Sequence, residues 1–168
     1  GDVRVVESDS AEESGVGEGV VVATRWSARV RDHLRAGGNA VLLVDEQSGS
    51  PFPVASMPFW REAVKVFEPH QAWGEFPHEG WADLQCAAFA PDLALDTSEA
   101  RDEITPILRR VDARTAEVHD YAVEVAYGNG RLIVSTLRLE GSRGDQPRGL
   151  SRSPAASYLL SAWVRALG

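Results

Sequence analysis

Two apolar runs decide the fold, Gly19-Val20-Val21-Val22-Ala23-Thr24 and Ala40-Val41-Leu42-Leu43-Val44. Neither run alternates with polar residues, which is typical of strands that are covered on both faces. Between them, apolar residues recur at four-residue spacing over residues 25–36, which predicts an amphipathic helix. Gly37-Gly38 ends that helix because glycine readily adopts the left-handed C-terminal conformation. Strand, helix and strand in this order form a βαβ unit, so we expect the two strands to be parallel.

The C-terminal part of the sequence predicts an antiparallel hairpin and then a helix. Apolar residues alternate with others over residues 118–127, Gly128-Asn129-Gly130 supplies a tight turn, and residues 131–139 return as the second strand. Ser153 is placed to cap a helix that begins at Pro154, because proline at the first position lacks only an N–H that the helix leaves unpaired.

The middle of the chain has no clean period, and its elements are expected to be short. A proline opens a candidate helix over residues 58–64, and residues 82–89 are predicted to form a second short helix. Residues 92–102 are predicted to be a polar connection. A strand is expected over residues 104–111, at an edge or with an irregularity, because Pro106 cannot donate a hydrogen bond to a ladder.

Length and charge limit the classes of function. The 168 residues are about the size of one domain, and we expect residues 1–18 to be a flexible or frayed segment before a single α/β domain over residues 19–168. The formal net charge of −8 argues against general binding to nucleic acid. No uninterrupted apolar stretch approaches a membrane span, so no membrane partner is expected. The chain begins with Gly1, and we interpret it as a segment of something longer.

The residues with nucleophilic side chains form no catalytic pattern. Lys65 is the only lysine and follows no glycine-rich loop, which argues against a phosphate-binding loop. The single cysteine, Cys86, has Leu84 and Ala88 where a nucleophile elbow needs small residues, normally glycine. We therefore predict no catalytic residue, and Cys86 is expected to be a buried core residue.

Ionisable side chains crowd into 14 residues and include possible ligands for zinc or a harder ion. Their spacing is not that of a His-Glu-x-x-His helix, and Gly80 weakens the helix that would align them. We expect these side chains to cap loops and to pair with arginines, so neither a metal nor another cofactor is predicted. The side chains are those of His70, Glu75, His78, Glu79 and Asp83.

The same stretch is rich in aromatic rings, which suit the apolar face of a sugar, beside polar groups that could bond its hydroxyls. The other interpretation is that the rings close the open end of the sheet. The candidate sugar-binding residues are Trp60, Trp73, Glu75, His78, Glu79 and Trp81.

Several stretches together resemble a known family. They are Trp73–Gln85, Pro106–Leu108 leading to Val111-Asp112, Glu124–Ser135 and Ala155–Leu160. Together they resemble the accessory domain found C-terminal to the catalytic modules of large bacterial glycoside hydrolases related to family 2 (β-galactosidase-like). The sequence departs from that pattern at Glu75, where aspartate is usual, and at Arg131, where lysine is usual.

The resemblance implies an α/β fold of the flavodoxin-like or class I glutamine-amidotransferase-like type, a three-layer sandwich with a mostly parallel sheet and a C-terminal antiparallel hairpin. Active amidotransferases carry a late His-x-Glu pair, whereas here His119 is followed by Asp120-Tyr121, so their chemistry is not expected.

The function implied is a non-catalytic accessory domain of a larger carbohydrate-active enzyme, whose partners are other domains of the parent polypeptide. The alternatives are a carbohydrate-binding module that uses the aromatic loop and, third, an independent hydrolase or amidotransferase. The location in the cell is not indicated by the sequence.

Overall fold

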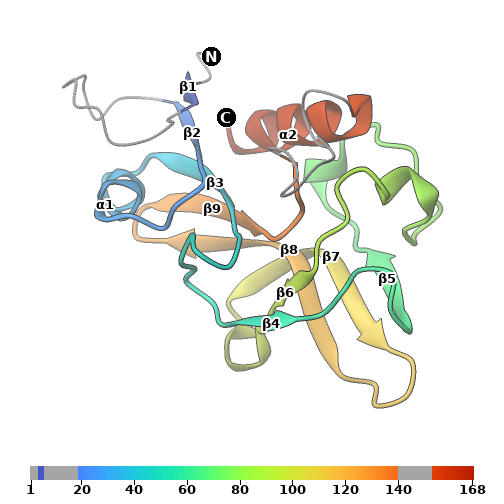
Figure 1. Cartoon of the computed structure of the whole chain (residues 1–168). Coiled ribbons are helices and arrows are strands. Elements are labelled where there is room, and N and C mark those ends of the chain that lie inside the picture. The colour runs from blue at the N-terminus through green and yellow to red at the C-terminus, as the bar shows by residue number, and fades with distance from the viewer. Residues whose placement is uncertain (1–3, 6–18, 140–152) are drawn as a thin grey trace.

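A single mixed sheet organises the part of the chain that the computed structural model describes, residues 4–5, 19–139 and 153–168 (Figure 1). Nine strands in those residues form the sheet. Its main path runs β1-β2-β3-β9-β8-β6-β4, while β7 pairs with β8 and with β5. The strands are β1 Arg4–Val5, β2 Val20–Ala23, β3 Asn39–Leu43, β4 Val54–Ser56, β5 Ala63–Phe67, β6 Leu93–Leu95, β7 Ile104–Asp112, β8 Val118–Tyr127 and β9 Gly130–Ser135. The α-helices are α1 Ala28–Arg35 and α2 Pro154–Leu167, and short 3₁₀ turns span Gln71–Trp73, Leu84–Cys86 and Ser98–Ala100.

The expected βαβ unit is present. Strands β2 and β3 are parallel and α1 connects them. Both faces of this part of the sheet are covered, because alternate residues of β3 point to opposite sides. Leu42 packs in one cluster with Leu34 of α1, and Val41 packs in another with Trp163 of α2. The continuous apolar runs are explained by this double burial.

The hairpin is also present, and its turn lies against the end of α1. Strands β8 and β9 are antiparallel with Tyr127 opposite Gly130, and Gly128 has a φ of 61°, the left-handed region that favours glycine. A Cβ on Gly130 would collide with the carbonyl oxygen of Gly38. The glycines on both sides therefore let the helix end and the hairpin turn come close together.

The fold class expected from the sequence is wrong. The three parallel pairings join β1, β2, β3 and β9, and all pairings beyond β9 in the described sheet are antiparallel. The domain is thus a β-rich mixed sheet rather than a flavodoxin-like, mostly parallel three-layer sandwich. Only the parallel end carries α-helices among the residues described (Figure 1).

The error arose in the middle of the chain, where the strands are short. Residues 58–64 were expected to begin a helix but form turns that lead into β5, and the expected connection over residues 92–102 contains β6. A strand of three residues shows too little alternation to be recognised. Residues 82–89 were expected to form a helix, yet only one 3₁₀ turn is found there.

The strand predicted over residues 104–111 is confirmed, because β7 spans Ile104–Asp112. It is not an edge strand, because it pairs with β5 on one side and β8 on the other. Pro106 is nonetheless accommodated by an irregularity: the pairing with β8 shifts between Pro106 and Leu108, and β5 reaches only as far as Leu108. Because β5 does not extend to Pro106, the N–H that proline lacks costs no hydrogen bond to β5.

The two ends of the described chain form α2 and β1. Ser153 caps α2 as expected, since its Oγ accepts a hydrogen bond from the N–H of Ala156 at 3.2 Å. Of the N-terminal segment 1–18, Arg4–Val5 form β1 beside β2, and the rest lies outside the described residues. Neither α1 nor α2 in the described part is long and apolar enough to cross a bilayer.

Candidate functional site

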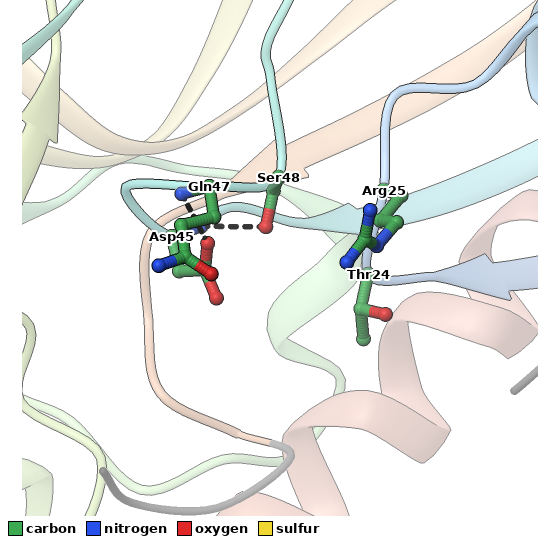
Figure 2. Close-up of a pocket in the computed structure, with 5 residues that line it drawn as sticks. All are labelled: Thr24, Arg25, Asp45, Gln47 and Ser48. Atoms are coloured by element: carbon green, nitrogen blue, oxygen red, sulfur yellow. Dashed lines mark hydrogen bonds between the residues drawn. The ribbon is translucent and has the colours of Figure 1, made fainter. Parts of the chain in front are cut away.

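A polar pocket lies where β2 and β3 end. Parallel neighbours finish at the same edge of a sheet, so the loops that follow them meet there, which is where open parallel sheets commonly bind ligands. The pocket has a volume of about 180 Å³. Figure 2 shows side chains of the two loops facing each other across it. The residues that line it are Thr24, Arg25, Asp45, Gln47 and Ser48.

The walls of this pocket are held by hydrogen bonds between and within the two loops. Ser48 is buried, and its Oγ accepts from the N–H of Asp45 at 3.0 Å. Asp45 in turn accepts from the N–H of Gln47 at 2.6 Å (Figure 2). The N–H of Trp26 donates to the carbonyl of Ser48 at 2.8 Å, which ties the first loop to the second.

The aromatic residues singled out in the sequence do not form one sugar-binding surface. Trp73 is a core residue that packs on Phe67 with ring centroids 4.3 Å apart, and its indole N–H donates to the carbonyl of Glu68. His78 stacks on the same Phe67 ring at 4.7 Å and accepts from the N–H of Gly80. Trp73 is therefore part of the core, whereas His78 stays exposed beside the ring of Phe67.

The other four candidates are exposed, as His78 is. Trp60 is 51% exposed and Trp81 is 58% exposed, and Glu75 and Glu79 are exposed as well. Trp60 lies 6.0 Å from the ammonium of Lys65, whereas Trp81 is bridged to Val66. Since Lys65 and Val66 are neighbours on one strand, their side chains point to opposite faces. The two tryptophans therefore lie on different faces, and sugar binding by the aromatic loop stays a prediction.

The only cysteine has no activated thiolate. Cys86 is fully buried, and burial, with the nearby charge of Asp83, raises the pKa of its thiol to about 12. A thiol with that pKa is almost wholly protonated at neutral pH and is a poor nucleophile. Within the described residues, no three His, Cys, Asp or Glu side chains are placed to hold a metal ion together.

Sequence reasoning missed a buried pair of cations. Lys65 and Arg110 are cross-strand partners in β5 and β7, and both are buried. The ammonium of Lys65 donates to the carbonyls of Arg61 and Ala63 at 3.0 and 2.8 Å and lies 5.5 Å from the ring of Phe59. Burial, helped by the charge of Arg110, lowers the pKa of Lys65. The alternation of β5, with Lys65 and Phe67 on one face, was the available signal.

A half-buried network connects the hairpin to α2. Glu124 of β8 accepts two hydrogen bonds from Arg131 of β9, at 2.8 and 3.1 Å, and lies 3.3 Å from Nε2 of His70. Arg131 also donates to the carbonyl of Ala166, near the end of α2. Burial alone would raise the pKa of Glu124, but the hydrogen bonds from His70 and Arg131 outweigh it, so the net shift is downward.

This network predicts a pH dependence of stability. Because the pKa of Glu124 is lower in the folded state, its stabilisation is complete above the ordinary glutamate pKa and is lost as pH falls through the folded value. Glu124→Gln should therefore cost about 1–3 kcal/mol in the free energy of unfolding at pH 7 and progressively less below about pH 4.5. Urea unfolding at several pH values tests this, with exposed Glu75→Gln as the control. A cost that stays constant down to pH 3 would contradict it.

An exposed apolar surface lies on the outer face of β5, β7 and β8. Val64, Val111 and Val118 are successive cross-strand partners, so they share that face, and Val66 and its partner Trp81 form the next row. Val64 is 52% exposed and Trp81 is 58% exposed, while the other three are half-buried. We call these five residues the valine face.

These features define a β-rich mixed α/β domain with one polar pocket and one exposed apolar face as its most distinctive described surfaces. A family model described as "Domain of unknown function (DUF8487)" matches residues 21–162, and the chain belongs to this family. The search of curated proteins found none that matches this chain.

Two solved structures are similar to the chain. A β-galactosidase from Rahnella sp. R3 is 12% identical with a TM-score of 0.43, over 87% of this chain and 22% of that one. A cytoplasmic protein from Salmonella typhimurium LT2 is 9% identical with a TM-score of 0.45, over 83% of this chain and 59% of that one. The chain thus spans less than two thirds of either protein. Neither structure is described as amidotransferase-like.

Proposed function

We propose that this chain is a non-catalytic accessory domain of a larger carbohydrate-active enzyme, a glycoside hydrolase, and that its valine face docks on another domain of the same polypeptide. The observation that carries the docking is the exposure of Val64 and Trp81, 52% and 58%, on one face of the sheet. The carbohydrate-active parent is supported by the sequence stretches that resemble such accessory domains.

The valine face has the composition of a contact surface. Large apolar side chains that share an exposed face mark interaction sites, since covering them removes apolar area from water. Tryptophan and arginine are enriched where interfaces bind most strongly, and Arg109 lies on this face as the cross-strand partner of Val66. Arg109 is itself held by buried Asp120, through a hydrogen bond of 3.0 Å, and is therefore preorganised.

Cys86, His70 and His78, three side chains that could carry out chemistry, take part in structural contacts. The Cys86 thiol is buried with a pKa of about 12. Nδ1 of His70 accepts a hydrogen bond from the N–H of Ala72, and Nε2 lies 3.3 Å from the carboxylate of Glu124. His78 is stacked on Phe67. These contacts support a role in binding rather than in catalysis.

The docking is tested with Val64→Ser combined with Trp81→Ser. In the parent polypeptide, the double variant should lower the melting temperature, because the interface loses its two most exposed apolar side chains. The melting temperature of this chain by itself should change little, since both side chains are exposed there. Val54→Ser is the matched control, as Val54 is 39% exposed but lies on β4.

Two results would contradict the proposed function. One is an equal effect of the double variant and the control in the parent polypeptide. The other is turnover of aryl glycosides or glutamine by this chain alone, which would make it an enzyme in its own right.

A further inference from the structure

We propose that Lys65 is a site of reversible modification by carbon dioxide, which adds to the side-chain nitrogen and forms a carbamate beside the guanidinium of Arg110. These two residues are cross-strand partners in β5 and β7, so their side chains share one face of the sheet. Their chain neighbours Val64 and Val111 belong to the valine face, which is the opposite face of the same strands. The inference therefore does not rest on the docking proposed above.

The hydrogen bonds around Lys65 suit an uncharged amine. Its Nζ donates to the carbonyls of Arg61 and Ala63 at 3.0 and 2.8 Å. A neutral amine has two N–H groups, one for each of these acceptors, and keeps a lone pair, whereas an ammonium has a third N–H. Within the residues described, that third N–H has no carboxylate or other hydrogen-bond acceptor. Burial and the charge of Arg110 lower the pKa of Lys65, which raises the share of the neutral, nucleophilic form.

Arg110 holds a buried donor that lacks an acceptor. The residue is 6% exposed, its Nη2 donates to Asp112 at 3.2 Å, and its guanidinium also contacts the hydroxyl of Tyr121. Its Nε has no partner among the described residues, which costs free energy in the interior. His119, the next cross-strand partner on β8, likewise has a buried Nδ1 without a partner in the described part of the chain. Lys65, Arg110 and His119 thus form one row of basic side chains, and an added negative charge there would be stabilised by the cations around it.

Carbon dioxide supplies that charge in one balanced step. The lone pair of Nζ forms a bond to the carbon, one C–O π bond breaks so that its electron pair moves to oxygen, and the nitrogen releases a proton to water. The neutral amine and carbon dioxide thus give a carbamate anion and a proton, with no oxidant or reductant. The carbamate oxygens can accept from Nε of Arg110, while the remaining N–H stays with one backbone carbonyl. The other carbonyl loses its donor, but the charge-assisted hydrogen bonds to Arg110 are the stronger ones.

Size and charge select carbon dioxide over larger electrophiles. Lys65 is 7% exposed, and the rings of Phe59 and Trp60 lie 5.5 and 6.0 Å from its nitrogen. At these distances the rings attract an ammonium only weakly, and apolar surroundings suit a small apolar reactant. An aldehyde is bulkier and would give an imine, which offers Arg110 no negative charge.

The proposal is tested by ¹³C NMR of this chain, labelled with ¹⁵N-lysine, in a buffer that contains ¹³C-bicarbonate. Lys65 is the only lysine, so a carbamate on its side chain is the one whose ¹³C is bonded to ¹⁵N and gives a split signal. A carbamate on the α-amino group of the chain gives an unsplit signal. The split signal should appear at neutral to mildly alkaline pH and disappear when bicarbonate is removed.

Two variants test the role of the neighbouring cation. Arg110→Gln should lower the intensity of the split signal severalfold, because the carbamate loses its counter-charge. Arg114→Gln is the matched control and should leave the signal unchanged, since Arg114 is exposed and pairs with Glu62 on the surface. Absence of a split signal from the unaltered chain overturns the proposal, as do equal signals from the two variants. Circular dichroism confirms that both variants are folded, and the result for the unaltered chain stands even if Arg110→Gln impairs folding.

Discussion

Gly130→Ala is expected to be the most damaging single substitution in the hairpin. A Cβ at this position would overlap the carbonyl oxygen of Gly38 and lie 3.0 Å from that of Leu34. Both obstacles are backbone atoms, which cannot move aside as a flexible side chain could. The hairpin turn and the end of α1 would have to separate, at a cost of about 3 kcal/mol or more in the free energy of unfolding.

Gly80→Ala separates this steric effect from the general cost of replacing glycine. Gly80 has a φ of +94°, but a Cβ there meets nothing within 4 Å, so only backbone strain of about 1–2 kcal/mol is expected. Urea unfolding of both variants gives the comparison. If Gly130→Ala costs no more than Gly80→Ala, the close approach of turn and helix end is not as described.

Asp120→Ala is expected to have the second large effect. Asp120 is fully buried and accepts hydrogen bonds from the hydroxyl of Thr97 and from Nε of Arg109. Removing the carboxylate leaves the guanidinium without its nearest counter-charge and the buried hydroxyl without an acceptor. Breaking a buried ion pair from one side costs about 3–5 kcal/mol, and we expect the lower part of that range because Arg109 is partly exposed.

The matched control is an ion pair on the surface. Asp32 pairs with Arg35 at 2.9 Å, yet both side chains are mostly exposed. Asp32→Ala should therefore cost less than about 1 kcal/mol. Chemical unfolding of the two variants measures the difference, and similar costs would show that Asp120 does not hold Arg109 in a buried network.

The parallel end of the fold could be predicted from the sequence because its signals are long and local. The apolar runs of β2 and β3, the Gly37-Gly38 helix end and the Gly128–Gly130 turn each point to one local structure, and the structure confirms all of them. The antiparallel end depends on pairings between strands that are far apart in the sequence. β4 and β6 are three residues each, too short to show a period.

The candidate site was harder to predict, because its residues are brought together by contacts between segments that are far apart in the sequence. Trp73 stands beside polar residues in the sequence, but the 3₁₀ turn at Gln71–Trp73 and the contact with Phe67 place it in the core. The pocket joins Arg25 to Gln47, which come from two loops separated by a helix and a strand. Only the parallel pairing of β2 and β3 brings these loops to the same edge.

The proposed docking is tested most directly by hydroxyl-radical footprinting of Trp81 in this chain and in the parent polypeptide. Trp81 is 58% exposed here, so it should be oxidised readily in the chain alone and severalfold more slowly in the parent, where another domain covers it. Buried Trp73 serves as the internal reference, because it should be protected in both. Equal oxidation of Trp81 in the two samples would contradict the proposal that the valine face docks on the parent enzyme.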